Sequence, residues 1–478
     1  MRTSAALLLL VAGGLVGCAR LRPGAGFDTV TELVAARSPG REVVWNQGTA
    51  EDEAAAARVR SLLDGELSLD AAVQIALLNN RTLQAVYEQL GIAQADLVQA
   101  GLLENPLLAA DVRFPTAEGA AIGAGLGLAQ EFIALLQIPL KRRVAESAFD
   151  EAQLTASAAV IDLVAAVKRV FYHLQGAEQL LELRRSVVEA TALSADVARS
   201  QREAGNITRL DLASERALHE QARADLARAE TEVVEDREEL TALMGLWGTQ
   251  TAWRIAPRLP DLPRTDVAAE GLETLAVGQR LDLAAARQRI EGILLARDLT
   301  RWYRFGPAGG LGVVAEREVD NGVWSVGPSI ELPVPIFDQG QAKLAGQTSQ
   351  LRQREQEHAA LAVAIRSQVR RAYTRMSHAR ALADHYWTTL LPLRVQVLQQ
   401  MQLEYNAMLA GVFQLLVAKR DEIDAGRGYI EALRDYWIAR CDLERAVGGE
   451  LALAETPPPS AIPAPPERTH HEHHHHGG

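Results

Sequence analysis

The chain has 478 residues, a formal net charge of −12 and a hydrophobic share of 48%. This acidic balance argues against nucleic acid as a partner. After the first twenty residues, no apolar run reaches the roughly 20 residues that a transmembrane helix requires. If the protein crosses a membrane, it must therefore do so with β-strands.

The first residues have the pattern of a secretory signal. One cation precedes a short apolar run from Ala5 to Val16, which is too short to span a bilayer. The run ends in Leu15-Val16-Gly17-Cys18, which resembles the lipobox of bacterial lipoproteins. This resemblance implies a signal peptide over residues 1–17, acylation of Cys18 and sorting to the outer membrane. An ordinary signal peptide with a chance cysteine is the alternative.

The rest of the chain is an internal duplication. Residues 76–83 match residues 276–283 at an offset of 200, and residues 210–216 match residues 413–419 at an offset of 203. Each half is predicted to run long helix, two short strands, long helix, turn and long helix. The predicted organisation is a lipidated segment over 18–66, a first repeat over 67–248, a linker over 249–270, a second repeat over 271–449 and a Pro-rich disordered tail over 450–478.

Hydrophobic spacing predicts three long helices in the first half. The segment from Ser68 to Ala100 alternates apolar steps of four and three, which indicates a coiled-coil seam with Ser68 as N-cap. A second helix is predicted after Pro139, from about Val144 to Ala204, and a third over 210–244. Sixty helical residues would reach about 90 Å, more than a globular domain needs. A solvated rod of alternating charge fits locally but leaves the apolar seam unexplained.

Two segments in each half alternate apolar residues with small or polar ones, as membrane barrel strands do. A soluble β-patch that caps the coiled coil is the alternative. A closed barrel needs about eight strands, and open edges are not tolerated in lipid, so four strands per chain require assembly. Three copies would give twelve strands around a lumen. The predicted strands cover 106–114, 121–129, the segment from Leu311 towards Glu318, and 324–334.

From about Leu67 to Gly449, the chain resembles the TolC-type outer-membrane efflux protein family, in its heavy-metal-efflux-like branch. The family's hairpin turn has a Gly six residues before an Asp, followed by Val or Leu, and residues 205–212 match it. The second turn departs, because Met408 replaces the glycine and Gln414 replaces the aspartate. The resemblance implies a mainly α fold with a small β part. Long coiled-coil hairpins would form a periplasmic α-barrel, and four strands per chain would complete a 12-stranded trimeric outer-membrane β-barrel.

The resemblance also implies partners and site residues. A homotrimer held in outer-membrane lipid would be loaded by a periplasmic adaptor (membrane fusion) protein and an inner-membrane pump. By position, the gate at the hairpin tips would use Arg209, Asp211 and Gln414, although Asp211 could equally act as a helix cap. Docking of the adaptor would use the two turns, unless their apolar residues pack intramolecularly: Gly205, Asn206, Ile207, Met408, Leu409, Gly411 and Val412.

No enzymatic motif is present, so the chain is predicted not to be an enzyme and to require no cofactor. The internal histidines at 173, 219, 358, 378 and 385 are interpreted as surface or interface residues rather than ligands. The tail is different, because its six imidazoles suit Cu(II), Ni(II), Zn(II) or Co(II) unless they are a purification tag. The tail histidines are His470, His471, His473, His474, His475 and His476.

The predicted function is an outer-membrane channel of a tripartite efflux system that exports substrate from periplasm to exterior. Most of the chain would lie in the periplasm, and the histidine tail makes heavy-metal cations a candidate cargo. The alternatives are a periplasmic adaptor and a coiled-coil metal-binding lipoprotein. Neither explains two equivalent halves with strand pairs at matched positions.

Overall fold

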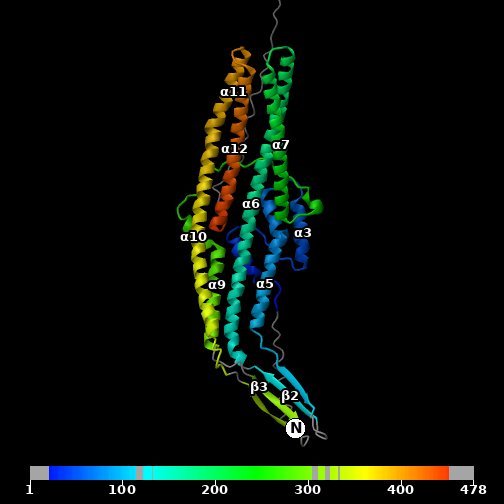
Figure 1. The fold of residues 1–478 in the computed structure, drawn as a ribbon, viewed down its shortest axis with the longest axis vertical. Helices are drawn as coiled ribbons and strands as arrows, with labels where there is room; N and C mark the ends of the chain where they lie inside the picture. The colour runs from blue at the N-terminus through cyan, green and yellow to red at the C-terminus, as the bar shows by residue number, and fades with distance from the viewer. Residues whose placement is uncertain are drawn as a thin grey trace, which may run out of the picture.

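Two long helical hairpins, one from each half of the chain, lie along the length of the molecule (Figure 1). A small sheet lies at one end of the hairpins, and the two hairpin turns lie at the opposite end. Among the described helices, none has both the length and the apolar character needed to cross a membrane. The computed structural model describes residues 21–114, 122–131, 133–303, 310–317, 323–331 and 334–451.

The first half is built around one helix of 71 residues, which extends about 107 Å. It begins at Ile133, so the predicted start at about Val144 is wrong. Pro139 lies inside the helix, in its second turn, where it removes one hydrogen bond from the backbone ladder. The helices of this half are α2 (Phe27–Ala35), α3 (Ala50–Leu62), α4 (Leu69–Asn79), α5 (Arg81–Ala100), α6 (Ile133–Glu203) and α7 (Arg209–Met244).

The second half repeats this plan with one irregularity. A π-helical turn, η2 (Tyr386–Leu390), interrupts the long helix just before Pro392. Proline clashes with the carbonyl four residues earlier, and a local π turn relieves that clash. The other helices are η1 (Gly248–Thr251), α8 (Leu272–Gln279), α9 (Leu281–Tyr303), α10 (Gln341–His385), α11 (Leu391–Asn406) and α12 (Val412–Val447).

The predicted continuous helix from Ser68 to Ala100 is broken at Asn80. Ser68 does cap its start, since its hydroxyl accepts a hydrogen bond from the Ala71 amide at 3.1 Å. The Asn80 side chain accepts from the Leu83 amide and donates to the Leu243 carbonyl at the end of α7. This long-range bond gives Asn80 an extended backbone and starts a second helix.

The second repeat contains the same break at Arg280, 200 residues further on. Each break packs against a glycine that ends the last helix of its own repeat. A Cβ on Gly245 would lie 2.6 Å from the Asn79 carbonyl oxygen, and one on Gly448 would lie 3.3 Å from the Arg280 backbone. Both glycines also have left-handed backbones, so other residues would be strained there.

Two hydrophobic cores lie in the middle of the molecule, and α6 contributes to both. The first core is formed by residues of the helices from α2 through α7, and its fully buried side chains include Tyr87 and Leu240. The second surrounds Trp437, whose indole stacks on Tyr172 of α6 with ring centroids 5.2 Å apart. Cys441 is a free cysteine and is buried in this second core.

The strands of both halves form one antiparallel sheet in the order β1-β2-β3-β4. Its register places apolar side chains from Leu108, Leu126, Val313 and Val326 on one face. The other face carries glycines and serines together with Asp111, Arg113 and Glu316, which form two ion pairs. The strands are β1 (Leu107–Arg113), β2 (Gly123–Gln130), β3 (Gly310–Arg317) and β4 (Trp324–Glu331).

The apolar face of this sheet has no cover within the described chain. Leu108 is 71% exposed and Val326 is 68% exposed. The outer strands β1 and β4 each pair on one side only. Uncovered apolar strands with free edges pair readily with other chains or enter lipid.

Candidate functional site

The turn of the first hairpin is closed by backbone and side-chain hydrogen bonds. Gly205 adopts a left-handed φ of 79°, and the Asn206 amide donates to the Gln201 carbonyl at 2.8 Å. Arg202 then donates to the Ile207 carbonyl at 2.9 Å and holds the loop against α6. This is the helix ending that a glycine after the last turn favours.

Asp211 closes the start of α7 by a capping box with Thr208. Its carboxylate accepts from the Thr208 amide at 2.8 Å and from the Thr208 hydroxyl at 2.7 Å, while the Asp211 amide donates back to the hydroxyl oxygen. Both hydrogen bonds lower the pKa of Asp211, and the bond from the Thr208 hydroxyl has the larger effect. The carboxylate therefore stays ionised. The capping interpretation of Asp211 is therefore confirmed.

The turn of the second hairpin has the same backbone with different residues. Met408 adopts a φ of 60°, and the Leu409 amide donates to the Glu404 carbonyl at 2.8 Å. Gln414 replaces the aspartate as a cap, since its side-chain oxygen accepts from the Gly411 amide at 2.8 Å. This tip therefore carries no carboxylate at the capping position.

The predicted docking residues differ in exposure. Met408 is 94% exposed and Leu409 is 81% exposed, so the second turn presents two apolar side chains to solvent. Ile207 and Val412 are half-buried against their own hairpins. Gly205, Asn206 and Gly411 are exposed, as is the gate candidate Arg209. Intramolecular packing thus accounts for part of the predicted docking set but not for Met408 and Leu409.

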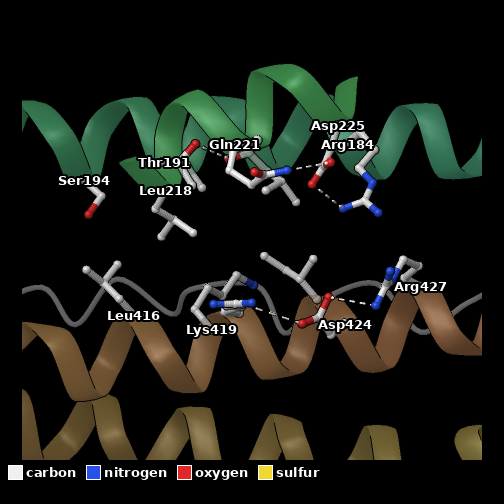
Figure 2. Close-up of a pocket in the computed structure, with 15 residues that line it drawn as sticks. Arg184, Thr191, Ser194, Leu218, Gln221, Asp225, Leu416, Lys419, Asp424 and Arg427 are labelled. Carbon is white, nitrogen blue, oxygen red and sulfur yellow. Dashed lines mark hydrogen bonds and ion pairs between the residues drawn. The ribbon is translucent and has the colours of Figure 1, made fainter. Parts of the chain in front are cut away.

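A cleft of about 240 Å³ lies between the two hairpins, and sequence reasoning did not find it. Residues of α6 and α7 form one wall and residues of α12 form the other (Figure 2). The ion pairs drawn there join residues of the same hairpin: Arg184 with Asp225 at 3.9 Å, Arg427 with Asp424 at 3.3 Å, and Arg420 with Asp424 at 3.8 Å. The hairpins can therefore separate at this level without breaking these pairs.

Polar pairs also recur along the seam between α6 and α7. The Ser194 hydroxyl donates to Glu215 at 2.6 Å, Arg184 faces Asp225, and His173 lies 2.7 Å from Asp236. Successive pairs are ten or eleven residues apart on both helices, which equals about three helical turns. This spacing is the signal in the sequence that locates these pairs.

Two of the predicted sites lie outside the described residues. The acylation site, Cys18, precedes residue 21, and the tail histidines follow residue 451.

This fold, with a helical body, two hairpin tips at one end and a small sheet at the other, is shared with the solved outer-membrane channels OprN and CusC. Residues 72–246 match the family model described as "Outer membrane efflux protein". Over this stretch the chain is similar to outer membrane efflux proteins, a family of channels rather than enzymes.

Three individual proteins show a similarity that extends over most of the chain. The cobalt-zinc-cadmium resistance protein CzcC of Cupriavidus metallidurans is 25% identical over 395 residues, covering 80% of this chain and 90% of CzcC. A membrane protein of Pseudomonas aeruginosa superimposes with a TM-score of 0.68 at 22% identity, covering 80% of this chain and 93% of that one. The channel CusC superimposes with a TM-score of 0.65 at 16% identity, covering 87% of this chain and 98% of CusC.

Proposed function

We propose that this chain is the outer-membrane duct of a tripartite efflux system and works as a homotrimer. The observation that carries the proposal is the sheet, whose apolar face is exposed and whose polar face bears Asp111, Arg113 and Glu316. Four strands per chain cannot close a barrel, whereas three chains supply twelve strands and a lumen. The apolar face would then meet lipid and the polar face would line the lumen.

Closure by neighbouring copies also resolves the two open edges. β1 of one protomer would pair with β4 of the next, so that no unpaired backbone group faces lipid. The long helices of the three protomers would continue the lumen as a tunnel through the periplasm. Energy for transport would come from the pump, so the duct itself needs no catalytic group and no cofactor.

The hairpin tips are proposed to be both gate and docking surface. Met408 and Leu409 are exposed apolar side chains at a turn, and such side chains fit a periplasmic adaptor protein. Arg209, Asp211 and Gln414 lie near the same end and would set the polarity of the constriction. The cleft between the hairpins gives room for the outward movement that opening requires.

Acylation of Cys18 would anchor each protomer in the outer membrane, because stable anchoring needs two or more acyl chains. The histidine tail would then lie close to the duct on a proline-rich spacer. Cobalt, zinc and cadmium ions are the proposed cargo, supported by the resemblance to CzcC and by the six imidazoles of the tail.

Two experiments test the channel function and the metal cargo independently. Purified full-length protein, reconstituted in a planar lipid bilayer, should give discrete conductance steps, and an absence of conductance would refute the duct. Cells that lack the gene should lose tolerance to cobalt, zinc or cadmium. Unchanged tolerance to all three ions, with conductance intact, would remove these metals as cargo but not the duct.

A further inference from the structure

A histidine and two carboxylates meet on the first hairpin, away from the tips and from the cleft. His173 of α6 places Nδ1 2.7 Å from Oδ2 of Asp236 on α7. Glu232 lies four residues before Asp236 and therefore shares its helix face. One ligand atom from each of the three residues lies within 4.8 Å of the others.

This donor set suits a divalent transition-metal ion. Zinc takes imidazole nitrogen and carboxylate oxygen at about 2.0–2.2 Å, so donors on one ion lie about 3–3.5 Å apart. The three donor atoms lie within 4.8 Å of one another, so they would have to move closer together to bind one ion. The two carboxylates balance the charge of a divalent cation, and the imidazole adds a nitrogen ligand that Zn(II) and Co(II) favour.

The three side chains of this cluster differ in their exposure to solvent. The side chain of Asp236 is 12% exposed, whereas that of His173 is 38% exposed. Glu232 is also partly exposed. An ion can therefore reach His173 and Glu232 from solvent and then bind the more buried Asp236.

The second repeat shows that the fold does not require this carboxylate. Helices α7 and α12 each have 36 residues and match at an offset of 203. Ala439 occupies the position that Asp236 holds in α7, and it is 5% exposed in the second core. An apolar residue packs well there, whereas a buried carboxylate costs free energy unless it has a partner.

Two features oppose metal binding. The hydrogen bond that His173 donates to Asp236 raises the pKa of His173, so a proton competes with the ion for the imidazole. The cation Arg434 of α12 packs beside α6 near Gly176. Its guanidinium donates to Asp435 at 3.0 and 3.1 Å, which partly neutralises it. Binding is therefore best measured in mildly alkaline buffer.

We propose that His173, Glu232 and Asp236 form a binding site for one divalent transition-metal ion, such as Zn²⁺, on the body of the duct. The site is distinct from the tail histidines. The proposal concerns a single chain and does not depend on whether metal ions are the exported cargo.

The test uses full-length protein in detergent with the six tail histidines changed to alanine, so that only the body binds metal. Titration with ZnSO₄ at pH 8, followed by calorimetry, should give one site per chain. His173→Ala and Asp236→Asn should each weaken binding by more than about tenfold, which is the least that disturbing even an outer-shell partner costs. His219→Ala is the matched control, because His219 lies on the same hairpin and contacts Thr191 instead.

Thermal unfolding provides a second measure of zinc binding and shows whether each variant is folded. Excess Zn²⁺ should raise the Tm of the tail-substituted parent and of His219→Ala, but not that of His173→Ala. Glu232→Gln, at a partly exposed position, provides a third variant that keeps the fold. The proposal is overturned if the parent binds no Zn²⁺, or if His173→Ala and Glu232→Gln bind it as tightly as the parent.

Discussion

Met408 occupies in the second hairpin turn the left-handed backbone position that Gly205 occupies in the first, with φ values of 60° and 79°. The two positions are 203 residues apart, and the following amide closes both turns in the same way. A residue with a Cβ is strained in this conformation by about 1–2 kcal/mol. The second tip therefore carries backbone strain that the first avoids.

Met408→Gly should relieve this strain and stabilise the second turn by up to about 1 kcal/mol. Hydrogen–deuterium exchange of the peptide spanning residues 404–412 should slow. Gly205→Ala is the reciprocal variant, and exchange of residues 201–209 should quicken. Faster exchange in Met408→Gly would show that the methionine side chain, rather than the backbone, holds the turn.

The exposed apolar pair at the second tip predicts a loss of docking. Met408→Asn with Leu409→Ser should reduce in-cell cross-linking to the periplasmic adaptor, because two exposed apolar contacts are removed while asparagine still tolerates the left-handed backbone. Val363→Ser is the control, since Val363 is 64% exposed on α10, far from the turn. Equal cross-linking in all three proteins would exclude the tip as the docking surface.

Asp211→Ala should loosen the first tip and raise single-channel conductance. The variant removes the acceptor for both the Thr208 amide and the Thr208 hydroxyl. Asp211→Asn keeps a capping oxygen but removes the charge, so it separates the two roles. A rise in Asp211→Ala alone indicates that the cap holds the gate, and a rise in both variants indicates that the charge does. No rise in either would contradict a gate at this residue.

The two faces of β4 should differ in their tolerance of charge. Val326→Arg places a cation on the apolar face and should cost about 2–4 kcal/mol near the middle of the bilayer. Gly327→Arg places the same cation on the polar face, where the structure leaves open space. Assembled protein in outer-membrane fractions should fall sharply for the first variant and little for the second. The reverse order would place lipid on the other face.

Glu450 joins the end of the second repeat to α6 and to the N-terminal segment. It accepts from Lys168 at 2.8 Å and from Ser38 at 3.0 Å. Burial alone would raise the pKa of Glu450, but Lys168 and then Ser38 and Arg41 outweigh burial and lower it. Because the folded pKa lies below the usual value of 4.5, this stabilisation is present above about pH 4.5 and is lost as the pH falls further.

Glu450→Gln should therefore cost about 1–3 kcal/mol at pH 7, a typical range for a hydrogen bond to a charged group. The difference in Tm between the variant and the natural chain should shrink as the pH falls below 4.5. Lys168 is a poorer probe, because it pairs with two carboxylates, Glu444 and Glu450, and its removal would disturb both. A Tm difference that stays constant down to pH 3 would contradict the coupling.

Local patterns in the sequence predicted the elements that local interactions determine. Gly205 ends α6 because a left-handed residue is needed there, and Thr208 with Asp211 caps α7 through side chains three residues apart. The strands were predicted from the alternation of apolar residues with small or polar residues alone. The duplicated plan followed from the offsets, and the structure repeats it down to the breaks at Asn80 and Arg280.

Those breaks were not predicted, because their cause lies far away in the sequence. Asn80 bonds to Leu243, and Arg280 bonds to the Ala446 carbonyl, each more than 160 residues later. The cluster of His173 with Asp236 escaped prediction for the same reason, since each residue alone resembles an ordinary helix-surface residue. Only the register of the hairpin brings them together.

The mass of the assembled protein tests the central claim most directly, because four strands per chain can form a duct only by association. Protein extracted from outer-membrane fractions in mild detergent should have, by native mass spectrometry, three times the mass of one mature chain. Heat should convert this species to monomer. Protein recovered as a monomer from the periplasm, without detergent, would contradict the account.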